Sequence, residues 1–238
     1  LHTWPDVVLN GGIYDSQEEF GIAVVSGMDL NGDGFDDIAV GACDNSESYY
    51  LAGKIYVYYG GNPMDTIPDT WFKGEIPNYS IGWYPLGWCG SRQNGYISFS
   101  SPDYPGGYGS GNYQGKVYLL KGGIGMDSIP EITKVGADSF TSLGYVTKYL
   151  GNLNADTLAE LGGNVCDSIN QCEVWLGKTT MKTDSSGCII GRNATDYLLN
   201  MAAAGDVDND GVDEALFSNP QGYSQKTVWL CKYTGPDG

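Results

Sequence analysis

Short apolar runs with the character of β-strands recur along this chain, and each is bounded by Gly, Asp or Asn. In the first quarter of the chain they occur at Ile22–Val25, Asp37–Ala42 and Gly53–Tyr59, and Thr70–Lys73 supplies a fourth. No segment shows a sustained helical period. The pattern therefore predicts an all-β protein built from short strands.

The strand pattern repeats. Phe20-Gly21, Ile81-Gly82 and Leu143-Gly144 each begin a similar block, and a fourth block fits with Leu198 in the place of the glycine, so that the blocks recur every 54–62 residues. Four short strands in each block of this length are typical of a β-propeller blade. A two-sheet sandwich would not explain the long-range repetition. We therefore expect one propeller domain over 1–238 with about four blades of four antiparallel strands, at about 15–76, 77–137, 138–192 and 193–238 plus 1–14.

The two ends of the chain complement each other in sequence. The last block stops after its third strand, whereas Pro5–Leu9 resembles the fourth-strand segment Pro68–Phe72. We expect an N-terminal strand to complete the last blade, either within the same chain or in a neighbouring subunit, because both arrangements protect sheet edges.

A loop rich in Asp and Gly follows the first strand of the blocks. In the first block, 29–37 places oxygen-bearing side chains at loop positions 1, 3, 5 and 9, a backbone carbonyl at 7 and Gly at 6, which suits Ca²⁺. The fourth block repeats the pattern at 206–214. Since β-type runs flank each loop and no Glu stands at position 12, an EF-hand is excluded. The expected ligands are Asp29, Asn31, Asp33, Phe35 and Asp37 in the first loop and Asp206, Asp208, Asp210, Val212 and Glu214 in the fourth.

The other two loops depart from this pattern. The third keeps oxygen donors at Asn152, Asn154, Asp156 and Glu160, with the carbonyl of Leu158, but Thr157 replaces the glycine. It is a further candidate calcium site. The second loop, 90–98, has lost its acids, and Arg92 could fill the empty site with its own positive charge.

Composition excludes several classes of function. With 12 Lys+Arg against 29 Asp+Glu, the net charge of −17 argues against binding to nucleic acid or anionic membranes. No apolar run is long enough for a membrane span. The one histidine, His2, makes a His-based triad implausible. The start at Leu1, without a visible signal peptide, is what a mature secreted protein would show, so we expect a secreted or cell-surface location.

The first block resembles an FG-GAP repeat, on Phe20-Gly21 followed by the run from Asp29 to Ala42. Such repeats build the calcium-binding β-propeller of integrin α-subunits and of many bacterial surface proteins. The resemblance implies that calcium stabilises the loops and that the propeller presents a binding face. Two features differ, because the family's usual propeller has seven blades and because Cys43 replaces the Pro of the FG-GAP signature.

Six cysteines allow fifteen disulfide pairings, and an even count suits an oxidising compartment. The layout of the blades suggests three bridges. Cys166–Cys172 would close a hairpin, and Cys43–Cys89 and Cys188–Cys231 would tie neighbouring blades. Six buried thiols are the alternative.

Aromatic residues crowd the block that lost its acidic loop. Candidate ligand contacts are Trp83, Tyr84, Trp88, Tyr104, Tyr108 and Tyr113. Exposed rings of this kind would stack on sugars or form a protein-binding patch, and packing between blades is the alternative.

No nucleophile–base pair is evident, and we expect no catalytic residue. Glu18-Glu19 reads as a solvated turn, and Asp37 is needed by calcium. The expected function is a calcium-stabilised extracellular propeller that binds a protein or glycan, or copies of itself as a filament, tube or ring. A propeller-fold hydrolase or lyase acting on polysaccharide is the alternative.

Overall fold

The computed structural model describes residues 5–12, 17–93, 95–107, 109–139, 141–156, 158–165, 171–175, 187–190, 200–219 and 227–232. Fifteen strands and no helix occur in these residues, as the strand pattern predicts. The strands form four antiparallel sheets in chain order, here sheets 1 to 4. Sheet 1 contains β1 (Phe20–Met28), β2 (Asp37–Ala42), β3 (Lys54–Tyr58) and β4 (Thr70–Lys73). Sheet 2 contains β5 (Gly87–Cys89), β6 (Tyr96–Ser101), β7 (Lys116–Lys121) and β8 (Ile132–Val135). Sheet 3 contains β9 (Thr147–Gly151), β10 (Glu160–Val165), β11 (Gln171–Trp175) and β12 (Gly187–Ile190). Sheet 4 contains β13 (Asn200–Gly205), β14 (Glu214–Asn219) and β15 (Thr227–Cys231).

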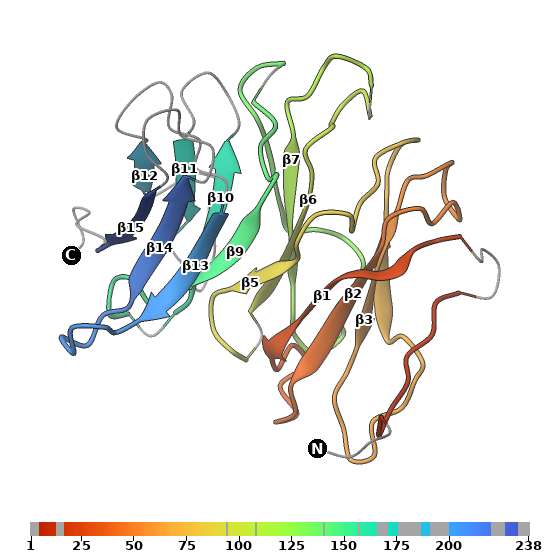
Figure 1. Ribbon diagram of the computed structural model, residues 1–238. Coiled ribbons are helices and arrows are strands. Elements are labelled where there is room, and N and C mark those ends of the chain that lie inside the picture. The colour runs from red at the N-terminus through yellow and green to blue at the C-terminus, as the bar shows by residue number, and fades with distance from the viewer. Residues whose placement is uncertain are drawn as a thin grey trace.

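The four sheets follow one another in space as they do in the chain. Sheets 1 and 4 lie at opposite ends of the row, with sheets 2 and 3 between them (Figure 1). Separate apolar clusters fill the three junctions between consecutive sheets, centred on Ile55 and Phe99, on Leu119 and Leu161, and on Val174 and Phe217. The central strands β6 and β7 of sheet 2 are accordingly buried along almost their whole length, since this sheet has a neighbour on each face.

Small residues let the sheets approach closely at the first two junctions. A Cβ atom on Gly41 of β2 would stand 2.5 Å from the carbonyl oxygen of Gly82. At the equivalent place between sheets 2 and 3, the Ser100 hydroxyl donates a hydrogen bond to the carbonyl of Gly144 (2.6 Å). Close packing against the preceding sheet thus explains the glycines that begin the second and third repeat blocks, Gly82 and Gly144.

The N-terminal segment does not complete sheet 4. Residues 5–12 contain no strand, and Leu9 packs against the apolar cluster of Val40, Tyr56 and Tyr58 on the outer face of sheet 1. Sheet 4 has three strands among the described residues. The expectation of completion within the same chain is therefore wrong, and closure of the sheets into a ring is not confirmed.

Glu18 explains why the segment stays on sheet 1. Its carboxylate is buried and accepts hydrogen bonds from the Tyr56 hydroxyl (2.9 Å), the Asn45 side chain (2.5 Å) and the backbone N–H of Gly12. Our reading of Glu18 as part of a solvated turn was wrong, because a charge-assisted network holds it in the interior.

Candidate metal-binding loops

Four loops join the first and second strands of the sheets, and we call them loop 1 (29–37), loop 2 (90–98), loop 3 (152–160) and loop 4 (206–214). Position 4 of loops 1, 3 and 4 has a left-handed backbone, with φ of 79° at Gly32, 62° at Ala155 and 61° at Asn209. The left-handed region turns the chain sharply, so that side chains at alternate positions face the same centre. The three loops therefore share a backbone shape although their sequences differ.

In loop 1, backbone N–H groups fix the orientation of the acids. Asp29 is buried and accepts from the N–H groups of Gly32 (2.7 Å), Asp33 (3.0 Å) and Gly34 (2.9 Å). Asp37 begins β2, is also buried, and accepts from Leu30 (2.5 Å) and Gly60 (2.8 Å).

Burial dominates the electrostatics of Asp37. It raises the pKa of this carboxyl above its ordinary value, against the opposing effect of the backbone N–H donors. A buried carboxylate in an acidic loop is destabilising until a cation neutralises it, which is the behaviour expected of a metal ligand.

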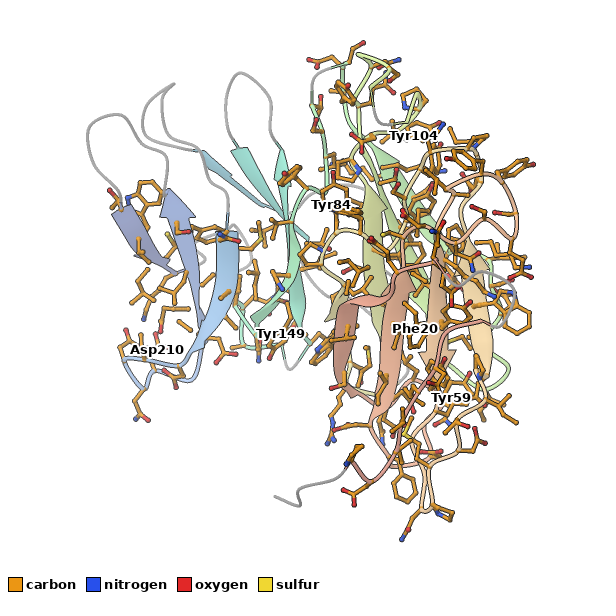
Figure 2. The ribbon with its side chains drawn as sticks, turned by 45° about the vertical axis from the view of Figure 1, so that its right-hand side comes forward. Phe20, Tyr59, Tyr84, Tyr104, Tyr149 and Asp210 are labelled. Carbon is orange, nitrogen blue, oxygen red and sulfur yellow. The ribbon has the colours of Figure 1, made fainter. Side chains whose placement is uncertain are left out.

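Loop 4 brings its acids closest together. Carboxylate oxygens of Asp206, Asp208 and Asp210 lie within 4.8 Å of one another. The Nζ atom of Lys232, which follows β15, lies 2.5 Å from Asp208 and 2.6 Å from Asp210. The same ammonium is 3.5 Å from Oε1 of Glu214, an oxygen that is buried and makes no hydrogen bond. Lys232 thus takes the place of a cation at the centre of the loop, which lies near Asp210 in Figure 2.

Lys232 and its partners shift one another's titration. The hydrogen bonds of Asp208 and Asp210 raise the pKa of Lys232, and Lys232 in turn lowers the pKa of Asp210. Both groups are at the surface, so water and salt weaken the pair. A divalent ion with several oxygen ligands can compete for the site.

Loop 3 keeps much of the same geometry. The N–H groups of Asp156 and Leu158 donate to Asn154 (3.1 Å) and Asp156 (2.9 Å), and the buried Glu160 accepts from the N–H of Leu153. The side-chain oxygen of Asn152 is buried and makes no hydrogen bond. Hard oxygen donors of this kind fit Ca²⁺, with Thr157 outside the described residues.

Arg92 does not fill loop 2. Its guanidinium reaches across to loop 1 and forms an ion pair with Asp36 (2.5 Å). From the sequence we considered only a role for Arg92 within loop 2, because its partner Asp36 comes from a different sheet. Arg92 therefore joins two neighbouring loops through Asp36, which is not one of the expected ligands of loop 1.

Backbone hydrogen bonds link the remaining loops in the same way. Gly90 and Ala159 exchange two of them between loops 2 and 3, at 2.7 and 2.9 Å. The N–H of Asp213 donates to the carbonyl of Asn152 between loops 3 and 4 (2.9 Å). A metal that orders one loop would thus also support its neighbour.

The aromatic candidates divide into packed and exposed residues. Trp88 stacks on Tyr149 of the next sheet, with ring centroids 4.6 Å apart, and Tyr84 packs on Tyr145 (5.1 Å). Tyr104 packs on Tyr79 (5.6 Å), and Trp83 is exposed. Tyr113 is partly exposed, and Tyr108 lies outside the described residues. Tyr84 and Tyr104, both labelled in Figure 2, thus pack on different partners, which agrees with the alternative of packed rings for part of the set.

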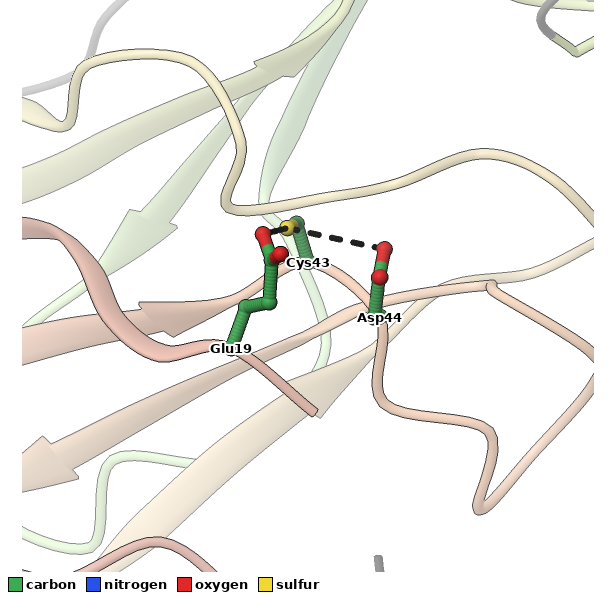
Figure 3. A group of neighbouring side chains, drawn as sticks. All are labelled: Glu19, Cys43 and Asp44. Carbon is green, nitrogen blue, oxygen red and sulfur yellow. Dashed lines mark hydrogen bonds between the residues drawn. The ribbon is translucent and has the colours of Figure 1, made fainter. Parts of the chain in front are cut away.

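The predicted Cys43–Cys89 disulfide is not formed. Both residues are buried thiols, and Cys43 donates a hydrogen bond to the carboxylate of Glu19 (3.3 Å), as Figure 3 shows. Burial, followed by the neighbouring acids, raises the pKa of Cys43, and burial raises that of Cys89. The raised pKa values keep both thiols protonated at neutral pH. The Cys166–Cys172 and Cys188–Cys231 pairs involve side chains outside the described part of the chain.

The first sheet and loop 1 match a known repeat. The family model of the FG-GAP repeat matches residues 20–58, which run from the start of β1 to the end of β3. This match confirms the resemblance on Phe20-Gly21 and loop 1. Proteins with this repeat are generally non-enzymatic, and the repeats are typically extracellular domains of a β-propeller family often found in adhesion. A comparison of the whole chain with curated proteins found no match. Within the described residues, no helix could cross a membrane.

Proposed function

We propose that this chain is a calcium-stabilised, extracellular array of FG-GAP blades that acts without catalysis, in adhesion to a protein or glycan or in assembly with copies of itself. The observation that carries the proposal is loop 4, where Asp208, Asp210 and Glu214 converge on one positive charge. Loop 1 shares three backbone N–H bonds with loop 4: Asp29 and Asp33 accept from the same loop positions as Asp206 and Asp210.

Calcium would supply positive charge at a place where the fold concentrates negative charge. Asp29, Asn31, Asp33, the carbonyl of Phe35 and Asp37 would hold it in loop 1, and Asp206, Asp208, Asp210, the carbonyl of Val212 and Glu214 in loop 4. Asn152, Asn154, Asp156, the carbonyl of Leu158 and Glu160 are the candidate ligands of loop 3. Because each loop contacts the loop of the next sheet, calcium would stabilise the junctions as well as single sheets.

The test is a calcium titration of the whole chain by calorimetry, with thermal unfolding in calcium and in chelator. The variant Asp210→Asn should lose one binding event and the stabilisation that accompanies it. Asp127→Asn is a matched control, because Asp127 accepts from the N–H two residues ahead (2.8 Å), as Asp210 does (3.0 Å), but lies outside the four loops. Equal melting temperatures of the wild type with and without calcium would contradict the proposal.

A further inference from the structure

At both ends of the row of sheets, apolar residues are exposed at positions that the inner junctions bury. We call the face of a sheet that packs on the following sheet its forward face, and the opposite face its backward face. Strand register identifies equivalent positions. In the third strands of sheets 1, 2 and 3, the forward residues Val57, Leu119 and Val174 are all buried.

Sheet 4 exposes its forward face. Register places Leu230 of β15 opposite Leu216, at the position of Leu119 in sheet 2. Leu230 is 53% exposed and Val228, two residues earlier, is 64% exposed, whereas Leu119 is 4% exposed. The same apolar side chains that close the inner junctions are therefore presented to solvent at this end.

A groove marks the place of the missing neighbour. It has a volume of about 210 Å³ and is lined in part by Ala202, Leu216, Ser218 and Val228. By strand register, Ser218 is equivalent to Ser100, whose hydroxyl donates a hydrogen bond to the carbonyl of Gly144 in the next repeat block. The groove thus lies where the first two junctions receive the glycine that begins the next repeat block.

Sheet 1 exposes the complementary surface along β1, at the edge of its backward face. Val24 of β1 is 65% exposed, whereas the residues at its register position in sheets 3 and 4, Thr147 and Met201, are buried against the preceding sheet. A Cβ atom on Gly21 would meet no atom within 4 Å, although the equivalent Gly82 packs on Gly41. The glycine turn of sheet 1 is thus formed and has no receiving sheet.

The N-terminal segment extends this surface. Leu9 covers Val40, Tyr56 and Tyr58 on the central strands β2 and β3 of the same face, while Val7 and Val8 of the segment are exposed. The segment therefore covers one apolar cluster and presents another.

We propose that sheet 1 of one copy of this chain docks on the forward face of sheet 4 of a second copy, so that the chains join head to tail through the kind of junction that joins their own sheets. The occupant is a second copy because this one chain contains both halves of the junction, the receiving groove at Ser218 and the unpacked turn at Gly21. Such a contact is heterologous, so it closes into a ring if the rotation allows and otherwise extends. This proposal specifies how copies of the chain would assemble, and it rests on the proposed function.

Charge predicts how the contact depends on solution conditions. Each copy carries a net charge of −17. The loop residues that form hydrogen bonds across inner junctions have as their equivalents at the proposed junction Asp206 of one copy and Asp36 of the other, and both are exposed acids. Copies should therefore associate more strongly in calcium and at moderate salt, which reduce this repulsion, than in chelator at low salt.

The test is the solution mass of the whole chain by light scattering and sedimentation at up to about 100 µM. Leu230→Lys places a charge on the receiving face of sheet 4, and Val24→Lys places a charge on the docking face of sheet 1. Each adds a positive charge, so a loss of association cannot come from increased repulsion. Ile124→Lys is the control, because Ile124 is 99% exposed and lies on neither surface. Each end variant should weaken association about tenfold or more, and the control should not.

Mixing the two end variants gives the sharpest result. Each is expected to be monomeric alone, but the intact sheet 4 of Val24→Lys should accept the intact sheet 1 of Leu230→Lys, giving one-to-one complexes that grow no further. A monomeric wild type in both calcium and chelator, or an oligomer that both end variants leave unchanged, would overturn the head-to-tail junction. Calcium affinity measured on the monomeric variants tests the proposed function separately, since their loops are intact.

Discussion

Leu119 and Leu230 offer a direct comparison of a covered and an uncovered sheet face, because they are the same residue at the same register position of sheets 2 and 4. The perturbation is Leu→Ala at each. Leu119 is 4% exposed and packs among Tyr96, Val117 and Leu161, so the substitution removes buried methyl groups and leaves a cavity. The expected loss is about 2–5 kcal/mol of unfolding free energy.

The same change at Leu230 should cost far less. The side chain is 53% exposed, so under half of the roughly 1.5–3 kcal/mol for full burial of a leucine is at stake, and no closed cavity forms. We expect a loss of about 1 kcal/mol or less in the monomer.

The assay is urea unfolding followed by tryptophan fluorescence, at about 1 µM protein so that copies do not associate. The two variants should differ by at least about 1 kcal/mol in unfolding free energy. If Leu230→Ala costs as much as Leu119→Ala under these conditions, the forward face of sheet 4 is covered within the monomer and the reasoning is refuted.

Four further outcomes are expected. Lys232→Met should tighten calcium binding at loop 4 about fivefold, the equivalent of about 1 kcal/mol for an exposed ion pair, and unchanged calorimetric affinity would show that the lysine does not compete. Ala155→Gly should stabilise the protein by about 1 kcal/mol in urea unfolding, because glycine adopts φ of 62° without strain; a destabilised variant would contradict this. Hydrogen bonds from Lys54 and then Lys73 lower the pKa of Glu47, so the stability lost in Glu47→Gln, about 1 kcal/mol at most, should be full above the ordinary pKa of 4.5 and vanish as pH falls through the lowered value. Cys43 and Cys89 should resist alkylation at pH 8 in the native protein and react after unfolding, and rapid native labelling would exclude their burial.

Much of the fold could be predicted from local sequence. The strand runs, the repeat blocks and the glycine at loop position 6 depend on residues close together in the chain. These predictions agree with the four sheets and with the left-handed backbone at Gly34 (φ 96°) and Gly211 (φ 92°). The assignment of calcium ligands likewise rests on alternate positions of one short segment. It remains a prediction, and the arrangement of the loop 4 acids around Lys232 supports it.

The errors share a physical cause. Arg92 pairs with Asp36, and residues 5–12 pack on the cluster at Tyr56. Each of these outcomes depends on which distant segment of the chain contacts a given side chain. The resemblance of Pro5–Leu9 to a strand segment, or of one loop to another, does not specify that contact. Cys43 was expected to form a disulfide but instead donates a hydrogen bond to the carboxylate of Glu19, because the pairing of β1 with β2 brings the two residues together.

The sequence by itself determined that this chain forms repeated antiparallel sheets with acidic loops, because strand period and loop spacing act over a few residues. Only the tertiary structure decided which sheet faces are covered. Leu119 and Leu230 have the same place in their repeats, yet one is buried and the other exposed. Leu119 is buried because sheet 3 packs on the forward face of sheet 2, whereas among the described residues no further sheet packs on the forward face of sheet 4.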